Sequence, residues 1–438
     1  MSDAIVVLFV FVAIFAGIIS EKLDKTIIVL YGALILILTG YVGFHEAVHA
    51  IDFDTIGLLM GMMLLVECMK ELKIFDWVAL RLGILTRGDP VLIFLVFSIA
   101  TAISSAFLDN VTTVLIVIPL LIALTQGIGL PPKLFVLSAI FLSNIGGTAT
   151  LIGDPPNILI GSQVSSINFF DFIQYLIIPV TISTVLALLI IKITKRTVIQ
   201  SRDSNFSLLF MSNLMLEQMK RQLALIHIPQ EVLWKALGVF LLVLLGFFTH
   251  AITHVEPAII AMTGAVVMLG TFHKRIDLHH LIAHIEWPTL LFFAGLFMIV
   301  GCMEHVGLLH MIADLLVSLT DDLWVMLMIV LFSAAILSAL VDNIPFVAVM
   351  IPILKQLTSA GAFAGHPKAY LLWWALSLGA CFGGNGSMIG ASANVIGCAI
   401  ARSKGVEIGF KEFLIQALPV TVMSIIVSAI YLTVLYHW

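Results

Sequence analysis

The chain has 438 residues, of which 61% are apolar and 11% are charged, and its formal net charge is -5. Its mean hydropathy of +1.16 excludes a water-soluble globular protein, because such a protein needs far more polar surface. The composition predicts an integral membrane protein that contacts the lipid bilayer and has no nucleic-acid partner.

Apolar runs long enough to cross a bilayer, about 17–25 residues, recur along the whole sequence. The runs predicted to cross the membrane are residues 3–20, 26–43, 55–72, 134–161, 171–194, 234–253, 257–272, 286–303, 369–400 and 411–436. Two further apolar segments, 91–125 and 323–357, are each interrupted in the middle by an Asp-Asn pair. The sequence therefore predicts an all-α polytopic membrane protein.

The two interrupted segments are near-copies of one another, and other stretches of the chain also match in pairs. The matched pairs are Asp109-Asn110 with Asp342-Asn343, Ile51–Gly61 with Ile285–Gly295, Gly146–Asn157 with Gly383–Asn394, and Pro179 with Pro419. They occur in the same order, with a spacing that drifts only from 233 to 240 residues. A fixed order with a slowly drifting spacing indicates an internal duplication.

Each half contains five spanning segments and one interrupted segment. The first repeat covers residues 1–194, a polar connector covers 195–233, and the second repeat covers 234–438. If each interrupted segment is a re-entrant hairpin, five crossings invert the second repeat relative to the first. Residues 206–226 of the connector are either an amphipathic helix on the membrane surface or a plain linker.

The placement of positive charge tests this topology, because Lys and Arg concentrate in cytoplasmic loops. With the N-terminus outside, all of the 21 lysines and arginines except Lys355 and Lys368 lie in inside loops. If each interrupted segment crossed the membrane once, the lysines and arginines would no longer concentrate on one side. We therefore expect the first hairpin, 91–125, to open from the cytoplasm and the second, 323–357, to open from outside. Both termini are then external, in a plasma or inner membrane.

The hairpin tips carry acidic residues at membrane depth. A carboxylate there costs about 2.5–3.5 kcal/mol on insertion scales, so two at equivalent places need a reason. Asp109 or Asn110 is expected to cap the second arm of its hairpin, with Thr112 and Thr113 in the first turn. At the matching place in the second half, Pro345 supplies a helix-start signal. Capping alone is the structural alternative for both aspartates.

A second pair of motifs breaks two of the spanning helices. Gly146–Asn157 contains glycines and the pair Pro155-Pro156, which cannot continue a helix, and Gly383–Asn394 does the same with glycines alone. Asp154 precedes the prolines as an N-cap would, so it has a structural alternative too. Broken helices at matched positions of inverted repeats indicate a transport site at the membrane midplane.

The polar residues of the tips and breaks form the candidate site. The candidates are Asp109, Asn110, Thr112, Thr113, Asn144, Thr148, Thr150, Asp154, Asn157, Asp342, Asn343, Asn385, Ser387, Ser392 and Asn394. Oxygen-rich groups without sulfur suit hard cations. A Na⁺ ion is expected at Asp109, Asn110, Asp342 and Asn343. The four cysteines lack metal-ligand spacing, and no cofactor is expected apart from a coupling ion, H⁺ or Na⁺ or both.

At these motifs the chain resembles the ion transporter superfamily. Within that superfamily it resembles the ArsB/NhaD permease group, most of all the P protein branch, with a citrate-transporter-like domain. The stretches that carry the resemblance are Asp109–Leu115, Asn144–Asn157, Asp342–Phe346 and Gly383–Val395. The resemblance implies a homodimer whose transport part, with both hairpins and both broken helices, moves as an elevator against a scaffold. It also places substrate and coupling ions at the hairpin tips.

The sequence departs from the related dicarboxylate/sodium symporters at one feature of the tips. Those symporters carry Ser-Asn-Thr there, whereas this chain has aspartate in place of serine at both tips. Two additional negative charges repel an anionic carboxylate unless a proton or a cation neutralises them.

The pattern favours a secondary active transporter rather than an enzyme. A cation that binds only the ionised form of Asp109 or Asp342 competes with protons, which predicts antiport of H⁺ against Na⁺ or another small ion. One alternative is proton-coupled movement of arsenite, a small anion or a carboxylate. The other is a channel-like conductance along the same polar path.

Overall fold

The computed structural model describes residues 2–20, 22–194, 216–217, 219–226, 228–359 and 361–438. Within these ranges the protein is helical and contains no β-strand. In the described part of the chain, eight helices are long and apolar enough to cross a membrane. They are α1 (Ser2–Ser20), α6 (Pro90–Phe107), α7 (Asn110–Gly127), α10 (Phe169–Thr194), α13 (Gln230–Thr253), α16 (Trp287–His305), α18 (Leu323–Leu340) and α22 (Phe410–His437). The prediction of an all-α polytopic membrane protein is confirmed.

The other helices of the described chain are shorter, apart from α4, which has 19 residues. They are α2 (Lys25–Leu38), α3 (Phe44–His49), α4 (Phe53–Glu71), α5 (Ile74–Leu85), α8 (Lys133–Gly147), α9 (Pro155–Gln163), α14 (Pro257–Phe272), α15 (Leu278–Ala283), α17 (Leu308–Leu319), α19 (Asn343–Ser359), α20 (Leu371–Gly383) and α21 (Ser392–Ser403), with a 3-10 turn at Gly384–Gly386. Four of these, α3, α5, α15 and α17, were not predicted. With 6 or 12 residues each, they are too short to give a spanning signal.

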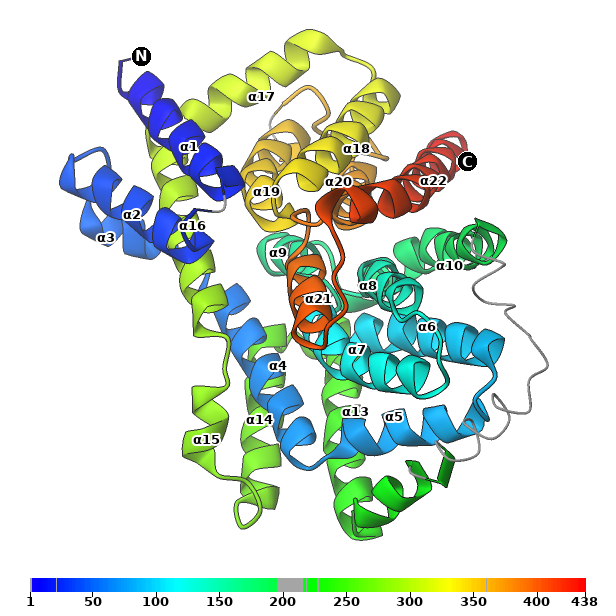
Figure 1. Cartoon of the computed structure of the whole chain (residues 1–438). Coiled ribbons are helices and arrows are strands. Elements are labelled where there is room, and N and C mark those ends of the chain that lie inside the picture. Colours follow the sequence, from blue (N-terminus) through cyan, green and yellow to red (C-terminus); the bar gives the residue numbers. More distant parts are fainter. Residues whose placement is uncertain (1, 21, 195–215, 218, 227, 360) are drawn as a thin grey trace.

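The two halves contain the same helices in the same order, so that α1–α10 match α13–α22. The matched elements pack across the halves in exchanged pairs. Helix α2 packs on α16 and α4 on α14, while α7 packs on α21 and α9 on α19. Figure 1 shows α9 and α21 near the centre of the molecule, with α1–α3 and α16 together on one side. Each half thus completes the packing of the other.

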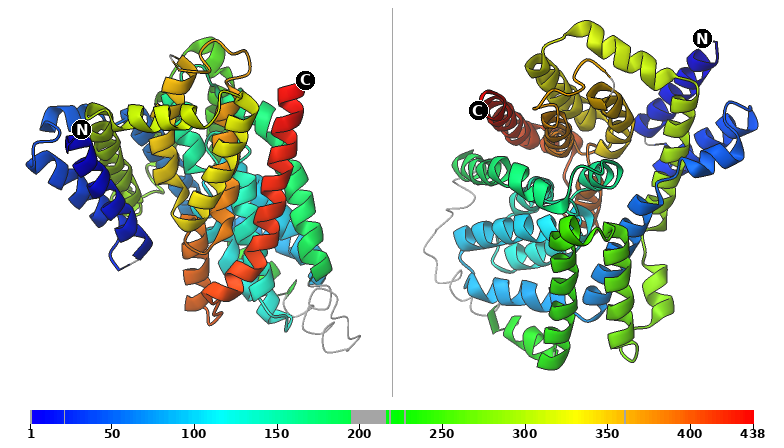
Figure 2. Two further views of the ribbon diagram at one scale, coloured as in Figure 1. Left: turned by 90° about the horizontal axis from the view of Figure 1, so that it is seen from above. Right: turned by 180° about the vertical axis from the view of Figure 1, so that it is seen from behind.

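The orientation of the halves in a membrane stays a prediction. Both termini lie toward the same face of the helix bundle (Figure 2, left). The hairpin arms are joined by two residues each, at 108–109 and 341–342. Three of the four arms have 18 residues, or roughly 27 Å at about 1.5 Å per residue. An arm of that length also reaches across a bilayer, so length does not separate a re-entrant hairpin from two crossings.

Both predicted helix breaks are present. Helix α8 ends at Gly147 and α9 begins at Pro155, with Pro at its first position. Helix α20 ends at Gly383 and α21 begins at Ser392. The runs 134–161 and 369–400, predicted to cross the membrane, are therefore each two helices with irregular backbone between them.

The predicted connector helix, 206–226, falls largely outside the described residues. Its described end is helical at 219–225. Met219 is buried there against α5, where its methyl group fills the space beside Gly83. The described part of the connector therefore packs on the first half.

Candidate ion-binding site

Asn144, at the end of α8, joins the two halves of the molecule. Its Nδ2 donates to Asn385 Oδ1 at 2.8 Å and to Asn394 Oδ1 at 2.7 Å, both in the second half. Its Oδ1 accepts from Asn110 Nδ2, at the first hairpin tip, at 3.2 Å. All four amides are buried. The structure thus brings together asparagines that the sequence predicted separately.

Asp154 lies between the two hairpin tips. Its Oδ1 accepts from Asn110 Nδ2 at 3.2 Å and from Asn343 Nδ2 at 3.3 Å. The residue stands at the N-cap position of α9, but its side chain makes no capping hydrogen bond, so the capping alternative is wrong. Its Oδ2 is buried without a hydrogen-bond partner, and the Cys381 thiol lies close to the carboxylate. A buried carboxylate oxygen is costly unless a proton or a cation compensates it.

Asp109 forms the first tip and caps α7, as predicted. Its Oδ1 accepts from the Thr112 backbone N–H at 2.8 Å, and its Oδ2 accepts from the Thr112 hydroxyl. The Thr113 hydroxyl donates to the Asp109 carbonyl at 3.0 Å. Both threonine hydroxyls therefore bond to Asp109 and stabilise the start of α7. Glu286, which directly precedes α16, is close enough to Asp109 for the two carboxylates to repel each other.

Asp342 forms the second tip and has different partners. Its Oδ2 forms an ion pair with Lys25, the first residue of α2, and accepts from Ser392 Oγ at 3.0 Å. Its Oδ1 is buried without a partner. Lys25 was expected in a cytoplasmic loop. Nothing in the sequence connects it to an aspartate 317 residues away, because only the tertiary fold brings α2 to the second tip.

Comparison with known proteins identifies the family. The profile described as "Citrate transporter" matches residues 15–379. The chain belongs to the citrate transporter family. It is 33% identical over 440 residues to an uncharacterized transporter of Mycobacterium tuberculosis, covering 99% of each chain. It is 32% identical over 439 residues to the 46 kDa membrane protein of Mycobacterium leprae, again covering 99% of each. The human P protein is 30% identical over 495 residues, which cover 96% of this chain and 58% of that protein.

Family membership establishes a membrane transporter rather than an enzyme. It confirms the resemblance to the ion transporter superfamily and its P protein branch. It also implies a small-molecule substrate.

The remaining predicted residues of this citrate transporter family member hold the two breaks in place. Asn157 Nδ2 donates to the carbonyls of Thr148 and Thr150, both at 2.9 Å. Asn394 Nδ2 donates in the same way to Gly384 and Ser387, both at 2.8 Å. Irregular backbone at membrane depth needs such partners. These amides therefore make the breaks possible.

The hydroxyls of the breaks also bond to backbone. Thr148 Oγ1 donates to the Asn144 carbonyl, and Thr150 Oγ1 donates to the Ala106 carbonyl on α6. Ser387 Oγ donates to the Ala339 carbonyl on α18, the matching contact in the second half. Each break is thus fastened to its own hairpin.

Two supporting serines were missed by the sequence analysis. Ser143 Oγ donates to the Asn110 carbonyl at 3.0 Å, and Ser377 Oγ donates to Asn157 Oδ1 at 2.6 Å. Both lie inside apolar helices, one turn or more before the break. A small polar residue in an otherwise apolar run was the only signal they offered.

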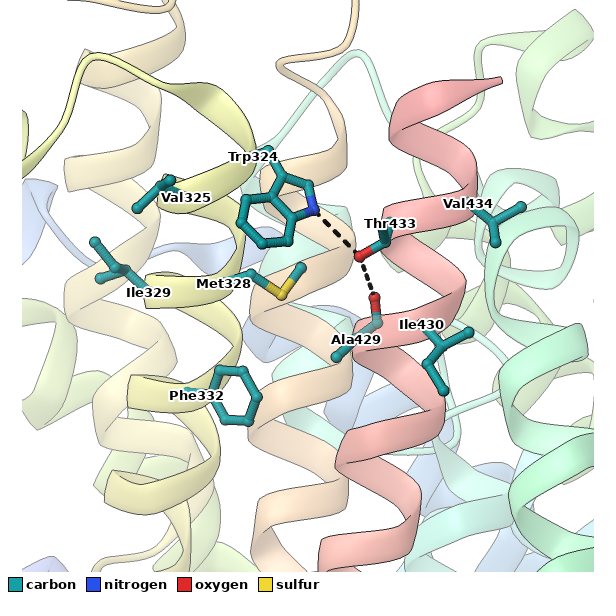
Figure 3. A pocket seen from close by; sticks show the side chains of 9 residues that line it. All are labelled: Trp324, Val325, Met328, Ile329, Phe332, Ala429, Ile430, Thr433 and Val434. Atoms are coloured by element: carbon teal, nitrogen blue, oxygen red, sulfur yellow. Dashed lines mark hydrogen bonds between the residues drawn. The ribbon is translucent and has the colours of Figure 1, made fainter.

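A separate groove of about 690 Å³ lies between α18 and α22 in this transporter (Figure 3). It is lined by Trp324, Val325, Met328, Ile329, Phe332, Ala429, Ile430, Thr433 and Val434. Its one hydroxyl, Thr433 Oγ1, accepts from Trp324 Nε1 at 3.2 Å and donates to the Ala429 carbonyl at 2.7 Å. An ion finds no charged partner there, so the groove is not the ion site.

Proposed function

We propose that the protein is a secondary active transporter in which protons and Na⁺, or another small cation, compete for carboxylates at the hairpin tips. The observation that carries the proposal is a pair of buried carboxylate oxygens without partners, Asp154 Oδ2 and Asp342 Oδ1. They come from different halves, and the two carboxylates are near enough to interact electrostatically. Exchange of a proton for a cation at such a pair is antiport.

The charge of the site supports a cation as substrate. The acidic residues at or beside the tips are Asp109, Asp154, Asp342 and Glu286, and the basic residue at the tips is Lys25. Lys70, which also acts on Glu286, forms an ion pair with Glu67 and is not counted. Four negative charges against one positive leave three in excess when all five ionise. Among the described residues no three His, Cys, Asp or Glu side chains gather as metal ligands. A cation here would take amide oxygens as ligands too, which suits Na⁺ better than a transition metal.

The packing supports an elevator mechanism. Helices α2, α4, α14 and α16 pair with one another across the halves, while the hairpins pack on the broken helices. The first group is a suitable scaffold, and the second carries the candidate residues. We further propose that the scaffold forms a homodimer in a plasma or inner membrane, with both termini external.

Transport of a carboxylate is a second candidate, favoured by Lys25. Its amine lies at the second tip, where it offers an anion a partner, and the family is described as a citrate transporter. Against this stands the excess of negative charge. A carboxylate would have to enter with protons or cations that neutralise it.

Reconstitution into liposomes with an internal pH dye tests these candidates. The liposomes are challenged in turn with Na⁺, Li⁺, K⁺, arsenite and citrate. Cation antiport predicts that Na⁺ or Li⁺ drives proton movement and that citrate does not. Proton movement with citrate but with none of the cations would refute antiport and favour the carboxylate. A current that is linear in voltage and far faster than carrier turnover would indicate a channel.

A further inference from the structure

Lys25 brings a positively charged amine into the candidate ion-binding site. Its Nζ forms an ion pair with Asp342 and donates to Ser392 Oγ at 2.8 Å. The centroid of the buried Phe292 ring lies 5.1 Å from the same nitrogen, within the range at which an aromatic ring stabilises a cation. A carboxylate, a hydroxyl and a ring thus surround one positive charge. We call this group the Asp342 seat.

Lys25 and its two polar partners, Asp342 and Ser392, belong to different groups of packed helices. Helix α2 packs mainly on α1 and α16. Asp342 directly precedes α19, and Ser392 begins α21. The ion pair therefore connects the proposed scaffold to the second hairpin and to the second broken helix. It has to break whenever the tip moves away from α2.

The described residues of the second half offer no equivalent amine to the first tip. Helix α14, which matches α2, begins at Pro257 where α2 begins at Lys25. Beside the first tip, Asp109 interacts with the carboxylate of Glu286, which Lys25 and Lys70 also influence at longer range. Among the described residues, the aspartate of the second tip is paired directly with an amine, whereas the carboxylate of the first tip is bonded to Thr112.

We propose that Lys25 is a tethered cation that occupies the Asp342 seat and competes there with the transported cation. Lys25 then limits how many cations the site binds. The inference rests on the proposed cation transport and adds to it a residue that determines stoichiometry and selectivity. The physical reason is that two positive charges cannot share the same carboxylate and hydroxyl oxygens at hydrogen-bond distance without strong repulsion.

The test compares the Na⁺ dependence of purified variants, measured as thermal stabilisation by Na⁺ and as Na⁺-driven proton flux in liposomes. Lys25→Ala empties the seat, so the half-saturating Na⁺ concentration should fall by about tenfold or more, as expected from removing a nearby like charge. The Hill coefficient should rise at the same time. Lys25→Arg keeps the charge and should retain the wild-type dependence. Lys22→Ala removes an exposed positive charge three residues earlier and is the matched control.

Removing one partner of a partly buried ion pair can destabilise the fold, so a second variant is needed. Lys25→Gln keeps hydrogen-bond donors for Asp342 and Ser392 but loses the charge. It should show the same gain in Na⁺ binding as Lys25→Ala. If the folded Gln variant keeps the wild-type Na⁺ dependence, the proposal is wrong.

The two readouts separate this inference from the proposed function. Wild-type protein that moves no protons in response to any cation refutes cation antiport. A gain of Na⁺ stabilisation in Lys25→Gln would still support the tethered cation in that case. Conversely, Na⁺-driven flux in the wild type without a gain in either variant refutes the tethered cation and leaves antiport standing.

Discussion

The two hairpin tips share the sequence Asp-Asn and a place in the fold, yet they use their aspartates differently. Asp109 directs its carboxylate to the start of its own helix, where the Thr112 backbone and hydroxyl occupy both oxygens. Asp342 instead pairs its carboxylate with Lys25 and Ser392 and leaves one oxygen without a partner. The first aspartate is largely satisfied locally. The second depends on the tertiary fold.

The asparagines do not follow this division. Asn110 and Asn343 both donate to the same oxygen of Asp154. The tips therefore converge on a residue that the duplication does not repeat, because the position matched to Asp154 is Ala391. The asymmetry of the site comes from two residues without a charged counterpart in the other half, Asp154 and Lys25, whereas Glu286 beside Asp109 is matched by Asp52.

The largest effect is expected at the point where the tips converge. Asp154→Asn keeps the size of the side chain but removes the charge of the carboxylate to which Asn110 and Asn343 both donate. Proton-coupled flux should fall by a factor of about 100 or more, which corresponds to about 2.8 kcal/mol at about 1.4 kcal/mol per tenfold. The measurement is dye-reported flux in liposomes, normalised to reconstituted protein.

Asp89→Asn is the matched control for that substitution. Asp89 is exposed and caps α6 through the backbone N–H groups of Val91 and Leu92. Asparagine caps a helix nearly as well, so flux should stay near the wild-type value. Full activity of Asp154→Asn would reduce that aspartate to a structural acceptor.

The second prediction separates the tips directly. Asp342→Asn should reduce flux by about thirtyfold, or roughly 2 kcal/mol, because it removes a carboxylate with an available oxygen. Asp109→Asn should reduce flux by only a few fold, because asparagine still caps α7. The ratio of initial flux rates in the two variants is the measurement. Equal losses of flux would mean that Asp109 takes part in transport as much as Asp342 does, although it also caps α7.

The third prediction concerns a feature that both halves share. A Cβ on Gly146 would overlap the Ala102 carbonyl on α6, and a Cβ on Gly383 would overlap the Ala335 carbonyl on α18. Gly146→Ala and Gly383→Ala should each destabilise the protein by about 1–3 kcal/mol, the usual cost of overpacking. Thermal unfolding in detergent is the measurement. Gly270, which has no atom near its added Cβ, is the control, and a destabilisation of Gly270→Ala as large as the others would contradict the explanation.

The sequence predicted which residues belong to the site better than it predicted which of them contact one another. Matched motifs located both tips and both breaks, because glycine, proline and polar residues are conspicuous inside apolar runs. The same signal could not assign partners. Lys25 looked like a loop lysine at the end of a span, and Asp154 looked like an ordinary cap before Pro155. Their roles depend on how α2 and α9 pack against the other half of the molecule. The local sequence pattern does not predict that packing.

The smallest effect is expected at an ion pair that resembles the Lys25 pair only in chemistry. Lys133, the first residue of α8, lies 3.0 Å from Glu412 on α22, and both side chains are substantially exposed at 43% and 38%. Exposed ion pairs contribute about 0.2–1 kcal/mol. Lys133→Ala should therefore lower thermal stability slightly and leave the Na⁺ dependence of flux unchanged. Glu412→Ala should match it, and the double variant should be no worse than either single variant. A large shift in Na⁺ dependence would mean that charge near α8 acts on the site at long range. The effect of removing Lys25 could then no longer be assigned to its contact with Asp342.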